Sequence, residues 1–183
     1  MSGFFGCVSR KECVADVFYG TDYHSHLGTK KAGMAFYNGE DFVRSIHSIE
    51  SAYFRNKFEP ELERFRDSYL GIGVISDMES QPITVTSHLG RFSVVTVGRI
   101  DNIEEITQEL LEEKIHFAEL SGSSINPTEI VSILINKGES FKEGIEIVYR
   151  KIKGSCSFLV LTDSCIYAAR DKFGRTPVII GKN

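Results

Sequence analysis

The C-terminal stretch CSFLVLTDSCIYAARDKFGRTPVIIG, residues 156–181, contains three short apolar segments separated by two polar turns. Segments of about four to eight apolar and β-branched residues, bounded by Asp, Ser, Gly or Pro, are typical of strands. The stretch therefore predicts strands over 156–161, 166–170 and 176–181.

The N-terminal end of the chain also predicts strands, which cover 3–9, 32–37 and 41–49. Asn38-Gly39 lies between the last two and is a strong signal for a two-residue hairpin turn. Three further strands, separated by polar turns, are predicted over 69–75, 82–87 and 91–98.

Apolar residues recur at helical spacing in the remaining segments. These segments cover 13–24, 51–68, 102–114, 127–136 and 140–151. Asn102 and Asn126 each stand where a helix would begin and are followed three residues later by glutamate, which favours N-terminal capping. Strands at both ends with helices between them predict an α+β sandwich of two sheets covered by helices.

The segment 51–68 carries an aromatic and aliphatic stripe at spacings of three and four. Its members are Phe54, Phe58, Leu62 and Phe65. Pro60 interrupts the stripe, so it either breaks the helix or occupies the first turn of a second one. The stripe is interpreted as a core face in preference to an interface.

Composition limits the possible partners and compartments. The chain has 183 residues, and at about 150 residues per domain this favours a single domain over 1–183. Its 21 Lys and Arg against 25 Asp and Glu give a net charge of −4, which disfavours nucleic acid as a partner. No apolar run approaches the about 20 residues of a membrane helix, and no secretory signal is evident. We expect a cytoplasmic protein that does not enter a membrane.

Metal and cofactor sites have no support in the sequence. The four cysteines are irregularly spaced without a Cys-x-x-Cys pair, and His24 and His26 have no third ligand nearby. We expect reduced thiols, with Cys7, Cys156 and Cys165 buried in apolar segments, and neither a metal nor a cofactor.

Four segments, taken in order, resemble one family, the class II glutamine amidotransferase domains, and among them those of the amidophosphoribosyltransferases of purine synthesis. The segments are SGFFG at 2–6, HLGTKKAGM at 26–34, the stretch from QP at 81–82 to GRIDN at 98–102, and IYAARDKFGRTP at 166–177. The resemblance implies the N-terminal-nucleophile hydrolase fold, a four-layer αββα sandwich.

The catalytic parts of the family are replaced in this sequence. The family attacks the glutamine amide with a thiol at its first mature residue, whose own α-amino group acts as base. Ser2 stands at that position, if Met1 is removed. An Asn side chain and the following Gly amide form the family's oxyanion hole. Val97 and Gly98 stand there, so only the Gly98 backbone donor remains.

The positions that hold the glutamine substrate in the family are replaced as well. Ser76 stands where the family has the arginine that binds the α-carboxylate, and Pro127 where it has the aspartate that binds the ammonium. Leu27 replaces another arginine. Other motif positions are retained and are interpreted as structural. These are His26 and Gly28 in one turn, and Gly174 after an ion pair expected between Arg170 and Asp171.

The losses predict a catalytically degenerate domain that serves as a binding, regulatory or structural module for an unknown ligand. The alternative is an active amidohydrolase that uses Ser2 after removal of Met1, or Cys7 after further processing. The final predicted strand would leave an open sheet edge. The chain is therefore expected to be a piece of a longer protein, or to have this edge covered by a protein partner or a second copy.

Overall fold

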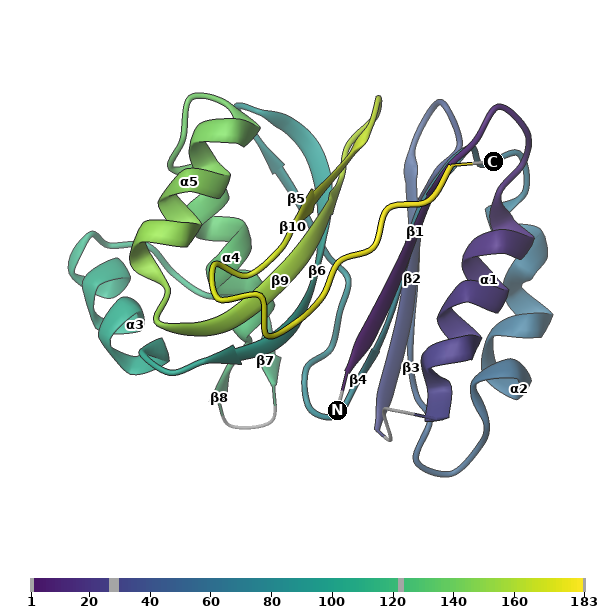
Figure 1. The fold of residues 1–183 in the computed structure, drawn as a ribbon, viewed down its shortest axis with the longest axis horizontal. Helices are drawn as coiled ribbons and strands as arrows, with labels where there is room; N and C mark the ends of the chain where they lie inside the picture. The colour runs from purple at the N-terminus through teal and green to yellow at the C-terminus, as the bar shows by residue number, and fades with distance from the viewer. Residues whose placement is uncertain (1, 27–29, 122–123, 183) are drawn as a thin grey trace.

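The computed structural model describes residues 2–26, 30–121 and 124–182 (Figure 1). Its centre is a pair of four-stranded antiparallel sheets. The first sheet has the order β1 (Gly3–Val8), β4 (Leu70–Ser76), β2 (Lys31–Tyr37) and β3 (Phe42–Ser48). The second has the order β10 (Ile166–Ala169), β9 (Gly154–Leu161), β6 (Gly90–Ile100) and β5 (Ile83–Ser87).

Helices cover the outer face of each sheet, as Figure 1 shows with the sheets nearly edge-on. The first sheet is covered by α1 (Val14–Tyr23), α2 (Phe54–Phe58) and the 3-10 helix η2 (Glu59–Phe65), and a short 3-10 turn η1 (His24–His26) follows α1. The second sheet is covered by α3 (Ile103–Glu112), α4 (Pro127–Asn136) and α5 (Phe141–Lys151). A small ribbon of β7 (Leu120–Ser121) and β8 (Ser124–Ile125) precedes α4. The predicted four-layer αββα sandwich is confirmed.

The core has three apolar layers, one between the sheets and one under each helical layer. The predicted stripe of 51–68 lies in the layer under α1 and α2, where Phe54, Phe58 and Phe65 are fully buried and Leu62 is partly buried. The stripe is therefore core, and Pro60 lies in the first turn of η2, the second of the two helices. Strand β4 is buried on both faces because helices cover one side and the second sheet the other.

A glycine in β4 allows α1 to approach the first sheet closely. A Cβ added to Gly73 would lie 1.9 Å from the Thr21 Oγ1 atom of α1. Any larger residue would push the helix away from the sheet.

Two strand predictions need correction. The turn between β2 and β3 has four residues, 38–41, because Tyr37 pairs with Phe42. Residues 176–181, all within the described range, form no strand. Thr176 is instead bound to Asp171 and Ser157, and Pro177 lacks the N–H that a ladder needs. Figure 1 shows this segment crossing from the second sheet toward the first.

The two predicted caps have different outcomes. Asn126 caps α4, since its side-chain oxygen accepts a hydrogen bond from the Thr128 N–H at 3.0 Å. Asn102 occupies the N-cap position of α3, but the capping bond predicted for its side chain is absent. Its side chain instead accepts from the Lys153 N–H at 2.8 Å and donates to the Lys151 carbonyl at 3.0 Å, which ties α3 to the turn before β9. Among the helices that the structure describes, none is long and apolar enough to cross a membrane.

Candidate functional site

Three strand termini of the first sheet meet at one end of the sandwich. Ser2 directly precedes Gly3, and Gly3 pairs with Ile75 near the end of β4. Ser76, the last residue of β4, pairs with Lys31, the first residue of β2. The start of β1, the end of β4 and the start of β2 therefore lie at the same end of the sheet, with β4 between the other two strands.

The loop that follows β4 connects this end to the second sheet. Ser80 accepts hydrogen bonds from the Lys31 Nζ atom at its hydroxyl and from the Asn126 Nδ2 atom at its carbonyl, both at 2.8 Å. One loop residue thus joins the start of β2 to the start of α4.

Gln81, which is only 1% exposed, extends this connection to β6. Its side-chain oxygen accepts from the Thr96 N–H at 2.7 Å and from the Thr128 hydroxyl at 3.2 Å, and its Nε2 atom donates to the Thr96 carbonyl at 3.1 Å. The two threonine hydroxyls are 2.6 Å apart. Thr96 precedes Val97 and Thr128 follows Pro127. The structure therefore brings Ser2, Ser76, Val97 and Pro127 to the same end of the sandwich.

The Ser76 side chain carries no positive charge, and its hydroxyl is already occupied by hydrogen bonds. It is fully buried, and its hydroxyl donates to the Glu79 carboxylate at 2.6 Å. The same oxygen accepts from the N–H groups of Glu79 at 3.1 Å and Met78 at 3.3 Å. A carboxylate is thus held directly beside the position where the resemblance implies an arginine. The Ser76–Glu79 pair was not recognised in the sequence, although Ser-x-x-Glu is a known local hydrogen-bonding pattern.

Val97 and Gly98 have clear structural roles in β6. Val97 is 9% exposed and packs in the apolar layer between the sheets. Gly98 has a φ of +126°, and a Cβ there would lie 1.9 Å from the Ser155 carbonyl oxygen. Only glycine satisfies both constraints. The Val97 side chain can donate no hydrogen bond to an oxyanion.

Pro127 occupies the first turn of α4, directly after the Asn126 cap. Its fixed φ suits that position and its missing N–H would have no helical partner there. The residue therefore favours the helix, but it offers neither charge nor donor to a ligand.

His24, and not His26, lies against the start of β1. A Cβ at Gly3 would be 2.7 Å from the His24 Cγ and Nδ1 atoms. The Nδ1 atom is buried and makes no hydrogen bond within the described residues. Burial, and secondarily His26, lower the pKa of His24. His26 is exposed and lies edge-on to Tyr23. The predicted positions Leu27 and Gly28 fall outside the described residues.

The turn after β10 is held by Asp171, but the predicted ion pair with Arg170 is wrong. The Asp171 carboxylate accepts from the N–H groups of Phe173 at 2.9 Å and Thr176 at 2.7 Å. Burial opposes its ionisation, yet these backbone donors and that of Arg175 lower the pKa of Asp171. No ion pair joins these two described residues. The Arg170 guanidinium lies beside Gly174, whose φ is +68°.

The four cysteines are free thiols, as expected. Cys156 is buried as predicted, but the burial predicted for Cys7 and Cys165 is wrong, since both are only half-buried. Burial raises the pKa of Cys13 and of Cys156 to about 12, and it also raises the pKa of Cys7. Cys7 is therefore a poor nucleophile. Across the described residues, no group of three or more His, Cys, Asp or Glu side chains is placed to hold a metal ion.

Comparisons with known proteins agree on one family. The model of the glutamine amidotransferase domain matches residues 68–183, more than half of the chain. The amidophosphoribosyltransferase of Methanocaldococcus jannaschii is 27% identical over 195 residues, which cover 100% of this chain and 40% of the relative. That of Synechococcus elongatus is 24% identical over 188 residues, which cover 98% and 37%.

The fold is shared with solved structures. The glutamine phosphoribosylpyrophosphate amidotransferase of B. subtilis, solved in complex with ADP and GMP, superimposes with a TM-score of 0.82 at 21% identity. The match covers 95% of this chain and 38% of that one. The chain spans about two fifths of the length of the curated relatives that it matches. The fold is therefore that of the N-terminal-nucleophile amidotransferase domains.

Proposed function

The chain belongs to the glutamine amidotransferase domain family, and from this premise we propose that it is a catalytically degenerate member that acts as a binding or regulatory module. One observation carries the proposal. The Glu79 carboxylate, held by the Ser76 hydroxyl at 2.6 Å, lies beside the position that binds a carboxylate in the family. The α-carboxylate of glutamine would meet a charge of its own sign there, and among the described residues no guanidinium is bonded to Ser76 or Glu79.

The oxyanion position supports the same proposal. Removing one oxyanion donor typically costs about 10²–10³ in rate. The Val97 side chain supplies no donor, and the Ser2 hydroxyl is a weaker nucleophile than a thiol. A domain that lacks these groups and a carboxylate clamp would lose nearly all of its rate enhancement over water.

The test is ammonia release from glutamine by the full chain, with the state of Met1 established by intact mass. We expect no glutamine-dependent ammonia with Met1 present or removed. Glutamine turnover that is abolished in Ser2→Ala and retained in Ser51→Ala would contradict the proposal. Ser51 is an exposed serine, so its substitution serves as a matched control.

The alternative function, an amidohydrolase active through Ser2, is supported by one contact. The His24 ring packs on Gly3, the residue after Ser2, and its Nδ1 atom has no partner among the described residues. A neutral imidazole at this place could serve as the base if the α-amino group is not free. Activity toward a non-glutamine amide that is lost in both Ser2→Ala and His24→Gln would favour this alternative.

We also propose that a second copy of the chain covers the C-terminal segment. A second proposal is that the protein resides in the cytoplasm. Ile179 and Ile180 are adjacent yet 91% and 84% exposed, which is unusual for paired aliphatic residues. The four free thiols suit a reducing compartment. Sedimentation equilibrium should give a dimer that dissociates in Ile180→Lys, whereas a monomer at all concentrations would contradict self-association.

A further inference from the structure

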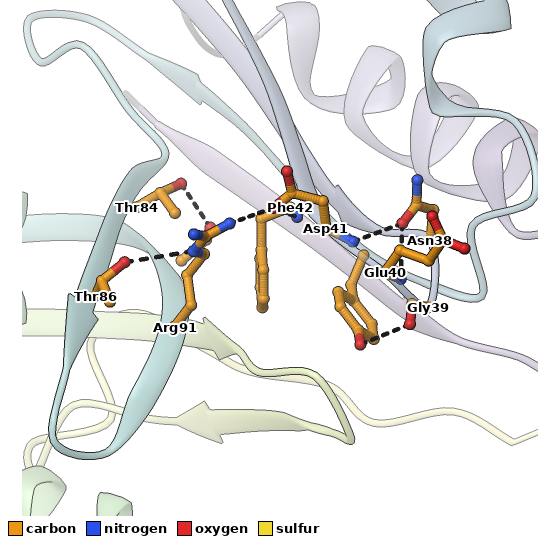
Figure 2. Close-up of polar contacts among 10 residues, drawn as sticks. Asn38, Gly39, Glu40, Asp41, Phe42, Thr84, Thr86 and Arg91 are labelled. Atoms are coloured by element: carbon orange, nitrogen blue, oxygen red, sulfur yellow. Dashed lines mark hydrogen bonds and ion pairs between the residues drawn. The ribbon is translucent and has the colours of Figure 1, made fainter.

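The turn between β2 and β3 lies at the opposite end of the sandwich from Ser2 and is built around the Asn38 side chain. Its Oδ1 atom accepts hydrogen bonds from the N–H groups of Glu40 at 3.0 Å and Asp41 at 2.8 Å. Figure 2 shows both donors converging on this one carbonyl oxygen. Two backbone donors therefore polarise the Asn38 carboxamide.

Gly39, the next residue, is unusually unconstrained. It is exposed, its φ is +95°, and a Cβ added to it would meet nothing within 4 Å. Its own N–H donates no hydrogen bond to any described residue, although its carbonyl accepts one from the Tyr37 hydroxyl at 2.9 Å. The Gly39 nitrogen is thus open to solvent base and adjacent in the chain to an activated carbonyl carbon.

We propose that this turn is a site of spontaneous deamidation, which the fold promotes. The Gly39 nitrogen, after losing its proton to solvent hydroxide, attacks the Asn38 Cγ atom. The new N–Cγ bond replaces the Cγ–Nδ2 bond, and Nδ2 leaves as ammonia after taking a proton from solvent. Water then opens the resulting succinimide at either carbonyl to give aspartate or isoaspartate. No oxidant or cofactor is required.

The two donors act on the tetrahedral intermediate of this reaction. Its negative charge develops on Oδ1, where the Glu40 and Asp41 N–H groups already point. Preorganised donors at a developing oxyanion need no rearrangement during the reaction, which makes them effective. The same contacts that hold the turn therefore favour attack on the amide.

The products would loosen a connection between the two sheets. Asp41 forms an ion pair with Arg91 of β6, which also donates to the Thr86 hydroxyl at 3.3 Å (Figure 2). Isoaspartate adds a backbone carbon before Gly39, next to the Tyr37–Phe42 pair, and either product adds a negative charge beside Glu40 and Asp41. Both changes disturb the placement of Asp41 opposite Arg91.

The experiment compares deamidation of Asn38 in the folded chain and in the chain unfolded by urea, at the same mildly alkaline pH, by peptide mass mapping. We expect faster conversion in the folded chain, by about tenfold, a conservative value given that one oxyanion donor is typically worth about 10²–10³ in rate. A folded rate equal to or below the unfolded rate would overturn the proposal. Each conversion releases one ammonia per chain without glutamine, so it is distinct from turnover.

Two variants distinguish the effect of the two N–H donors on the deamidation rate from the effect of the Asn38-Gly39 sequence itself. Asn38→Ser keeps an oxygen acceptor but has no amide, so its peptide should show no conversion. Glu40→Pro removes one of the two N–H donors while Asn38-Gly39 is unchanged, so its folded rate should fall toward its unfolded rate. Each variant carries its own unfolded reference, and circular dichroism confirms that it is folded. An unchanged folded rate in Glu40→Pro would show that the donors do not act.

Discussion

Replacing Gln81 by leucine should strongly destabilise the fold, because the Gln81 amide completes the ladder of β6. Strand β5 pairs with β6 only as far as Val94, so the edge of β6 at Thr96 has no neighbouring strand. The Gln81 side chain takes that place and satisfies both the N–H and the carbonyl of Thr96, at 2.7 and 3.1 Å. In this respect a single amide imitates a residue of an adjacent strand.

The magnitude follows from what leucine would leave unpaired. Two buried backbone groups of Thr96 would lose their partners, at about 1–3 kcal/mol each, so the free energy of unfolding should fall by about 2–6 kcal/mol. The Thr128 hydroxyl would lose its bond to Gln81 but keep its contact with the Thr96 hydroxyl, so it adds little to the loss of stability. Because a domain of this size is typically stable by only about 5–15 kcal/mol, the loss should be plain in urea unfolding.

The control is Gln108→Leu, since Gln108 lies on the exposed face of α3 and donates to Glu112 at 2.9 Å. Its effect should stay within about 0.5 kcal/mol. The midpoint of urea unfolding should move for Gln81→Leu with an unchanged slope. If both variants lost the same stability, Gln81 would not be acting as a strand substitute, and the reasoning would be wrong.

Three other expectations concern buried thiols, a close backbone approach and a buried carboxylate. Cys13 and Cys156 have pKa values of about 12, so at pH 8 only about one in ten thousand of these thiols is ionised in the folded chain. Both should therefore resist iodoacetamide in the folded chain and react fully in urea, which mass spectrometry would detect. Gly33→Ala should lower the melting temperature, since its Cβ would lie 1.9 Å from a backbone carbonyl oxygen at residue 81, whereas Gly181→Ala, with nothing within 4 Å, should not. The pKa of Asp171 is lowered from 3.8 in the fold, so its ionisation stabilises the fold above that pH and this contribution is lost as pH falls through the lower, folded value. Unfolding free energies measured against pH should therefore show a weaker acid-side decline in Asp171→Asn.

Hydrophobic periodicity was sufficient to predict the helices and most strands, because these elements bury one stripe or face in any context. Helix α4 spans the predicted 127–136, since Asn126 and Pro127 define its start through local geometry alone. The side-chain cap predicted for Asn102 and the ion pair predicted for Asp171 were wrong for a shared reason. Short polar side chains can bind several different backbone groups. Asn102 binds the backbone of Lys153, which only the tertiary fold brings close to it.

The candidate site was predictable as a set of positions but not as a set of contacts. Family motifs identified Ser2, Ser76 and Pro127. The strand order places Ser2 and Ser76 at one end, and the bonds of Asn126 and Thr128 to the loop after β4 bring Pro127 there. The roles of Glu79 and Gln81 depend on how the loop after β4 crosses between the sheets, which no local pattern specifies. In the sequence Gln81 stands out only as part of a Gln-Pro pair, and the bonds that make it central come from β6 and α4.

The residues that replace catalytic groups at this site are those that local stability favours. Val97 fills the apolar layer between the sheets, Pro127 suits the first turn of α4, and Ser76 closes a hydrogen-bonded turn with Glu79. Catalytic residues commonly reduce stability because they place polar groups where packing would prefer others. Under the proposed degeneracy, a site whose polar positions have each become structurally favourable has exchanged chemistry for stability, and the fold persists with its close superposition on the solved structures because none of these replacements disturbs its packing.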